Sequence, residues 1–243
     1  MNLPKKISPC PILESTISIM TNIKDNIFPD AIFGIIYNEL KNDYPNAQEL
    51  PVIQIPSYIR NSDIKLKYAP YYQLISEDFV LQIGPRIISL INPKIGKEYI
   101  GWHIIFEKIK NILKTINKLE IFESIEKIEL QYVDFFKDIN IFEKIKFKME
   151  MSDLENFNGI NIVTALEENQ FQISLNISNN VNFNINNGLQ NGSIIEIGVL
   201  KDKLESNDYE HILDIIEKAH IEQKKIFFNI LKSEYLLSLN PEY

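Results

Sequence analysis

Hydrophobic and polar residues alternate with a period of two in many short runs of this chain. Such alternation is typical of strands that bury one face. The alternating runs are 12–20 (ILESTISIM), 63–68 (DIKLKY), 73–76, 79–83, 125–136, 144–151 (KIKFKMEM), 159–166, 170–177 (QFQISLNI) and 193–201. Residues 87–91 are almost continuously apolar, as expected of a strand buried on both faces. Residues 50–57 carry a proline near each end, so they are an edge strand or an extended connection.

Three other segments show the longer period of an amphipathic helix. They are 29–41, 98–119 and 207–231, the last continuing to about 239. The second is the clearest, because Trp102, Ile105, Phe106 and Ile109 recur at spacings of three and four with lysines on the other side. Pro29 suits the first turn of the first helix.

The order of these elements predicts the fold class. Strands in consecutive runs favour antiparallel pairing, so we expect an α+β protein with mainly antiparallel sheets backed by three amphipathic helices. The chain divides into an N-terminal half, 1–140, and a C-terminal half, 141–243, each a small sheet backed by helix. Two pseudo-duplicated halves and one continuous domain both remain open, since no residue-by-residue repeat decides between them.

The asparagine-rich tract at 176–192 also allows two interpretations. Val181, Phe183 and Ile185 alternate, and Asn186-Asn187-Gly188 supplies residues that accept positive φ, which favours a hairpin. The alternative is a long loop or a disordered segment.

Composition and charge limit the function classes. The chain has 243 residues and a formal net charge of −8, and its only arginines are Arg60 and Arg86. Nucleic-acid binding depends on phosphate neutralisation, so this balance argues against it. No stretch approaches the length of a membrane span, and the N-terminus has no apolar signal segment, so we expect no membrane association. Cys10 is the single cysteine and fits a reducing, cytoplasmic location.

The sequence carries no recognisable catalytic, metal or cofactor motif. His103, His211 and His220 do not pair with other ligands in a metal-binding spacing, and Cys10 has no activating base nearby in sequence. The glycines are too sparse for a phosphate-binding loop. We therefore expect no cofactor and no metal, name no catalytic residue and leave enzyme activity open.

Four stretches of the first 140 residues together carry a family resemblance. SPCPILESTISI, VLQIGPRIISLIN, YIGWHIIFEKI and IELQYVDFF are similar to a sporadically distributed bacterial family without an established activity. The matching positions are Pro11, Glu14, Gln82, Gly84, Pro85, Asn92, Tyr99, Trp102 and Tyr132. The chain departs from the pattern at Gln131 and Asp134, where arginine and asparagine are expected. The resemblance implies a bacterial cytoplasmic protein with a patchy, mobile-element-like distribution, and no particular chemistry.

These observations favour a non-enzymatic protein-binding module whose partner is another protein or a second copy of the chain. A link to mobile elements or defence is a hypothesis that rests on the patchy distribution alone. The alternative is an enzyme or small-molecule-binding domain with a site of scattered polar residues. The candidate polar site is Glu14, Gln82, Arg86, Gln131 and Asp134. Arg86 is included because a lone arginine among lysines can hold a bidentate partner, either an internal carboxylate or a ligand.

Three tyrosines near Pro70 form a second candidate. Tyr68, Tyr71 and Tyr72 surround a strand break, where they would form an exposed recognition patch or pack against the core. Packing is the favoured interpretation.

Overall fold

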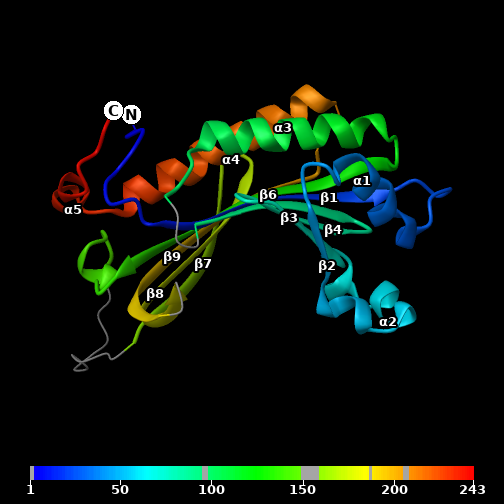
Figure 1. The fold of residues 1–243 in the computed structure, drawn as a ribbon. Coiled ribbons are helices and arrows are strands. Elements are labelled where there is room, and N and C mark those ends of the chain that lie inside the picture. The colour runs from blue at the N-terminus through cyan, green and yellow to red at the C-terminus, as the bar shows by residue number, and fades with distance from the viewer. Residues whose placement is uncertain (1–2, 95–97, 149–158, 186–187, 205–207) are drawn as a thin grey trace.

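One antiparallel sheet forms the centre of the molecule. The computed structural model describes residues 3–94, 98–148, 159–185, 188–204 and 208–243. In this part of the chain nine strands are ordered β2-β3-β4-β5-β1-β6-β9-β8-β7 (Figure 1). They are β1 (Ile12–Ile23), β2 (Asn46–Glu49), β3 (Tyr72–Ile75), β4 (Val80–Gly84), β5 (Ile87–Pro93), β6 (Phe122–Lys137), β7 (Asn161–Glu168), β8 (Phe171–Ile185) and β9 (Gly188–Asp202). The predicted α+β class with antiparallel pairing is confirmed.

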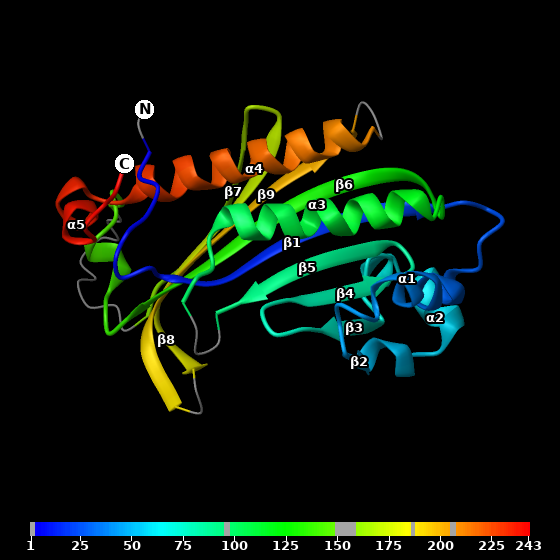
Figure 2. The same ribbon diagram turned by 45° about the horizontal axis from the view of Figure 1, so that its top comes forward.

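Two long helices cover one face of this sheet. The helices are α1 (Ile32–Leu40), α2 (Ser57–Ser62), α3 (Trp102–Lys118), α4 (Tyr209–Ile230) and α5 (Ser233–Ser238), with short 3-10 turns η1 (Pro29–Ala31), η2 (Pro51–Gln54), η3 (Ile64–Leu66) and η4 (Ile141–Glu143). Figures 1 and 2 show α3 and α4 side by side over the central strands. No helix in the described ranges is long and apolar enough to cross a membrane.

The core lies between the two long helices and the sheet. Ile17 of β1 is opposite Leu130 of β6, which is in turn opposite Val199 of β9, and each is 0% exposed. Ile109 of α3 and Ile216 of α4 are equally buried and belong to the same hydrophobic cluster. This cluster includes residues from both ends of the chain, so the helices are held to the sheet by one continuous apolar layer.

Side chains that alternate with the core residues point to the other side of the sheet. Thr16, Gln131, Gly198 and Ser174 are opposite one another across β1, β6, β9 and β8. None of the described helices lies on this side over β1, β6 and β9 (Figure 1). We call it the uncovered face. Its members that matter below are Glu14, Thr16, Ser18, Gln82, Ser89, Glu129, Gln131, Asn176 and Glu196.

Two predicted strands are wrong. Residues 63–68 contain η3 instead, because the Asp63 side chain accepts a hydrogen bond from the Lys65 N–H at 2.9 Å and caps a 3-10 turn. Residues 144–148 form only an isolated bridge between Ile145 and Leu231, and the rest of the predicted 144–151 strand lies outside the described residues. The 50–57 segment is a connection that contains η2.

The asparagine-rich tract forms a hairpin, as the alternation favoured. β8 and β9 remain paired as far as Ile185 and Gly188, although Asn186 and Asn187 of the expected turn lie outside the described residues. β9 then pairs with β6, which joins the strands of 141–243 to those of 1–140 in a single sheet.

Candidate functional site

The five candidate polar residues lie in four separate places. Glu14 and Gln131 lie near each other on the uncovered face, since Thr16, two residues after Glu14, is opposite Gln131. Gln82 is on the same face but farther along the sheet, because β5 separates its strand from β1. Arg86 lies in the turn between β4 and β5. Asp134 points to the opposite, helix-covered face, so the structure does not bring the five together.

Three carboxylates give the uncovered face an acidic centre. Glu14 and Glu196 lie on either side of Val133, and Glu129 follows two rows away on β6. We call Glu14, Glu129 and Glu196 the acidic patch. Amides donate to Glu196 from Gln131 and from Asn176, the latter at 3.2 Å, and the Thr16 hydroxyl donates to Glu14 at 3.3 Å.

The acidic patch has neutral donors but no ion pair within the described residues. Burial raises the pKa of Glu14, and the Glu196 charge raises it further. The same two causes, in the same order, raise the pKa of Glu129, with Lys127 acting in the opposite direction. The patch therefore carries negative charge that its own surroundings do not neutralise.

Asp134 belongs to a polar cluster beneath the helices. It is 1% exposed, and burial raises its pKa to about 8 although the charge of Lys94 acts to lower it. Its Oδ2 has no hydrogen-bond partner among the described residues. Nearby, Tyr132 shares hydrogen bonds with Tyr99 (3.1 Å) and His220 (3.4 Å). Burial lowers the pKa of His220 to about 3. Since Tyr132 is also 1% exposed, this cluster is closed to a ligand in the structure.

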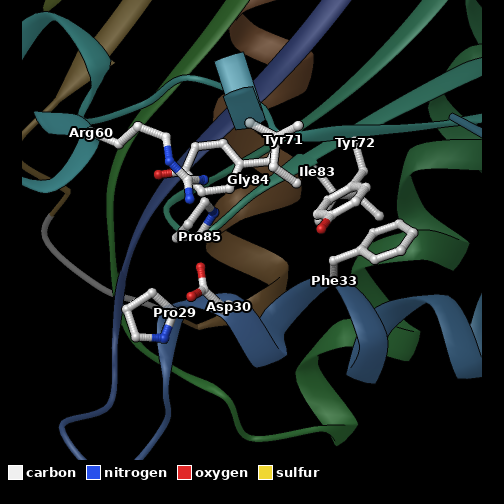
Figure 3. Close-up of a pocket in the computed structure, with 10 residues that line it drawn as sticks. Pro29, Asp30, Phe33, Arg60, Tyr71, Tyr72, Ile83, Gly84 and Pro85 are labelled. Atoms are coloured by element: carbon white, nitrogen blue, oxygen red, sulfur yellow. The ribbon is translucent and has the colours of Figure 1, made fainter. Parts of the chain in front are cut away.

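Two adjoining clefts open at the rim of the sheet, and both are lined by Pro29, Tyr71 and Pro85. The first has a volume of about 290 Å³, and Figure 3 shows Arg60, Asp30, Phe33 and Tyr72 around it. The second is about 400 Å³ and includes Lys67 and Arg86. Both arginines of the chain therefore line this pair of clefts.

Arg60, which lines the first cleft, has hydrogen-bond donors without acceptors. Its guanidinium carbon lies 4.3 Å from the centre of the Tyr71 ring, which is a cation–π contact. Its Nε and Nη1 atoms are shielded from solvent but have no hydrogen-bond partner in the described part of the chain. A buried donor without a partner costs about 1–3 kcal/mol, and more when it is charged.

The backbone around Gly84 places Tyr71 under this guanidinium. A Cβ at Gly84 would collide with the carbonyl oxygen of Ala69 and lie 3.1 Å from Pro70 Cα. Glycine thus allows the 69–71 segment to pack tightly on β4, where the Tyr71 N–H donates to the Ile83 carbonyl at 2.9 Å. Tyr71 is buried, which confirms the packing interpretation for that tyrosine.

The basic groups of the second cleft already have partners. Lys67 is ion-paired with Glu126 at 2.8 Å, and the Tyr68 hydroxyl donates to the same carboxylate. Arg86 Nη1 donates to Asn22 Oδ1 at 3.4 Å. Arg86 is therefore hydrogen-bonded to the side-chain amide of Asn22, whereas two donors of Arg60 have no acceptor in the described part of the chain.

No family model matches the chain, and no curated protein does. Within the described ranges there is also no group of three or more His, Cys, Asp or Glu side chains arranged to hold a metal ion.

Arg60 is the residue that sequence reasoning missed. Arg86 was chosen because arginine is rare in this chain, and Arg60 is equally rare. Arg60 lies eleven residues before Tyr71, on which its guanidinium packs. The missing information was spatial: nothing in the sequence stated that the short helix α2 would place its arginine on that ring.

Proposed function

We propose that this protein is a non-enzymatic protein-binding module whose uncovered face receives a basic segment of another protein. The observation that carries the proposal is the acidic patch on a sheet whose other face is occupied by α3 and α4. Glu14 and Glu196 share a row with Val133, Glu129 lies two rows away, and in the described residues only neutral groups donate hydrogen bonds to Glu14 and Glu196.

Electrostatic complementarity selects the occupant. Lysine or arginine side chains entering the face would lie beside Glu14 and Glu129, whose pKa values are raised by burial and by Glu196. Their charge would lower those pKa values and relieve the mutual repulsion of the carboxylates. A net charge of −8 acts in the same direction at longer range, because it steers basic partners toward the protein.

Flanking residues of the face suit a protein partner more than a small molecule. Met20, Val80, Ile91 and Val133 are partly exposed on the same side, between the polar positions. Apolar area between charged positions is the usual make-up of a protein interface. A link to mobile elements or defence remains part of this proposal only through the family resemblance.

The test combines site-specific cross-linking with charge-neutral variants. A photo-reactive residue in place of Thr16 probes the uncovered face, and one in place of Lys114 probes the exposed side of α3. In the native host, we expect Thr16 to capture a defined protein that Lys114 does not capture. Capture should weaken at high salt.

A matched pair of double variants shows whether the charge matters. Glu14→Gln with Glu129→Gln should reduce capture at least about tenfold, as expected for the loss of close charge pairs in an interface. Glu39→Gln with Glu107→Gln changes the net charge equally, but at exposed sites on α1 and α3, and should leave capture unchanged. Equal effects of the two variants, or capture of a second copy of this chain, would contradict the proposal.

A further inference from the structure

We infer that the cleft at Arg60 is a binding site for a carboxylate group attached to an apolar body. β1 reaches this end of the sheet at Thr21, whose N–H donates to the Arg86 carbonyl at 2.9 Å. Thr21 is seven residues from Glu14, or about 24 Å along an extended strand. The cleft is therefore a different surface from the acidic patch, and the inference goes beyond the proposed function.

The unmade hydrogen bonds of Arg60 define the polar part of the ligand. Nε and one Nη of a guanidinium form a fork that matches the two oxygens of a carboxylate or phosphate. In Arg60 both Nε and Nη1 are shielded from solvent and unpartnered among the described residues. A two-oxygen anion at the Nε edge would pair with Nε and Nη2, and one at the outer edge would pair with Nη1 and Nη2, so either position satisfies one of the unpartnered donors.

Asp30 favours carboxylate over phosphate. It lines the same cleft, and its charge and that of Arg60 both act on the Tyr72 hydroxyl, whose pKa is raised by burial, by Glu49 and by Asp30 and lowered by Arg60. One arginine and one aspartate leave the cleft without net charge. Asp30 repels either anion, but it repels a phosphate dianion about twice as strongly as a carboxylate monoanion, so the monoanion is the better partner for Arg60.

The walls define the apolar part. The Phe33 and Tyr72 rings stack with their centres 3.9 Å apart, and Tyr71, Ile83 and Pro85 complete the lining (Figure 3). A volume of about 290 Å³ is at the small end of ligand sites. It suits one apolar side chain or ring with its carboxylate, supplied by the C-terminal residue of a peptide or by a small organic acid.

Arginine NMR signals give a direct test, since the chain has only two arginines. The Nε–Hε region of the ¹⁵N–¹H spectrum should hold one peak for Arg60 and one for Arg86, assigned with Arg60→Lys. The probes are N-acetyl-phenylalanine, its C-terminal amide, phenyl phosphate and a tetrapeptide ending in phenylalanine as free acid and as amide.

We expect the free acid to shift the Arg60 peak in a saturable way, with Kd at or below about 1 mM. The Arg86 peak should stay in place, and the amide should bind at least about tenfold more weakly because it lacks the charge. Arg60→Lys, which lacks the fork, should lose about tenfold in affinity. Arg86→Lys is the matched control and should bind normally.

Each outcome decides a point. Saturable binding of N-acetyl-phenylalanine alone identifies a small acid as the source, and binding of the tetrapeptide acid as well identifies a peptide C-terminus. Equal binding of acid and amide, a tighter fit for phenyl phosphate, or parallel shifts of both arginine peaks would overturn the inference. If Arg60→Lys proves unstable, Arg86→Lys assigns the two peaks and the wild-type titration is sufficient, and none of these results depends on the acidic patch.

Discussion

Asp134 brings a carboxyl group into the layer between the sheet and the helices. An aspartate in an unfolded chain has a pKa near 3.9, whereas burial raises that of Asp134 to about 8. Between these values the unfolded state releases its proton and the folded state keeps it. The unfolded state therefore binds fewer protons, and the free energy of unfolding falls as pH rises from about 4 to about 8.

Asp134→Asn should remove this fall in the free energy of unfolding, because asparagine has nearly the same shape as aspartate and carries no charge. We expect the variant to be more stable than the wild type by about 2 kcal/mol at pH 8 and similar to it at pH 4. Urea unfolding at pH 4, 6 and 8 measures the difference. Asp25→Asn removes an exposed carboxylate and serves as control. An identical pH trend in both variants would show that Asp134 is not responsible.

Position along β6 explains why two of the candidate polar residues lie on opposite faces of the sheet. Gln131 and Asp134 are three positions apart on β6, and an odd separation places them on opposite faces. That much was available from the sequence. Which face the helices would cover was not, because it depends on how α3 and α4 pack across strands that are distant in the chain.

One carboxylate fastens the 57–68 segment, with α2 and η3, to the sheet. Glu126 of β6 is bound by Lys67 and Tyr68. Burial alone would raise the pKa of Glu126, but hydrogen bonds from Lys67, Tyr68 and Asn22 lower it overall. Lys67 and Glu126 are 32% and 25% exposed at their side chains, so solvent weakens the ion pair.

Glu126→Ala should therefore loosen this segment without unfolding the protein. We expect a local loss of about 1 kcal/mol, or about fivefold faster hydrogen exchange at the hydrogen-bonded amides of Arg60, Asp63 and Lys67. Amides of α3 should be unaffected. Mass spectrometry of peptic fragments provides the readout, with Glu123→Ala on the same strand as control. Faster exchange throughout the molecule would contradict a local role.

Elements with a long periodic pattern were predictable, and short ones were not. The α3 pattern extends over more than four turns and the β6 alternation over a full strand, so local residues suffice to define them. Six alternating residues at 63–68 could not exclude a 3-10 turn once Asp63 capped it. β2 escaped notice because all four of its residues are exposed and none marks a buried face.

Residues 1–140 and 141–243 are joined by paired strands and by a helix that packs on both of them. β6 and β9 pair from Lys127 and Asp202 to Lys137 and Gly192, and α4 packs on both strands. Consecutive strand runs predicted antiparallel pairing, but not that the two segments would share one sheet, because that pairing joins residues far apart in sequence. Whether the two segments arose by duplication stays a prediction.

Trp102 lies at this junction and reports on it. It belongs to α3 but contacts two residues of α4: its indole N–H donates to Glu217 at 2.8 Å, and its ring stacks on His220 with centres 4.0 Å apart. As the only tryptophan in the chain, it supplies a fluorescence signal for the contact between the two segments. Separation of α4 from α3 would expose it to water.

A shared core predicts that this contact breaks only when the whole protein unfolds. Both segments contribute to one hydrophobic cluster, so neither keeps its apolar surface covered alone. We expect urea transitions followed by Trp102 fluorescence and by far-UV circular dichroism to coincide, with one m-value that reflects the surface of the entire chain. A fluorescence change at lower urea than the loss of secondary structure would show instead that the segments separate first and fold as independent units.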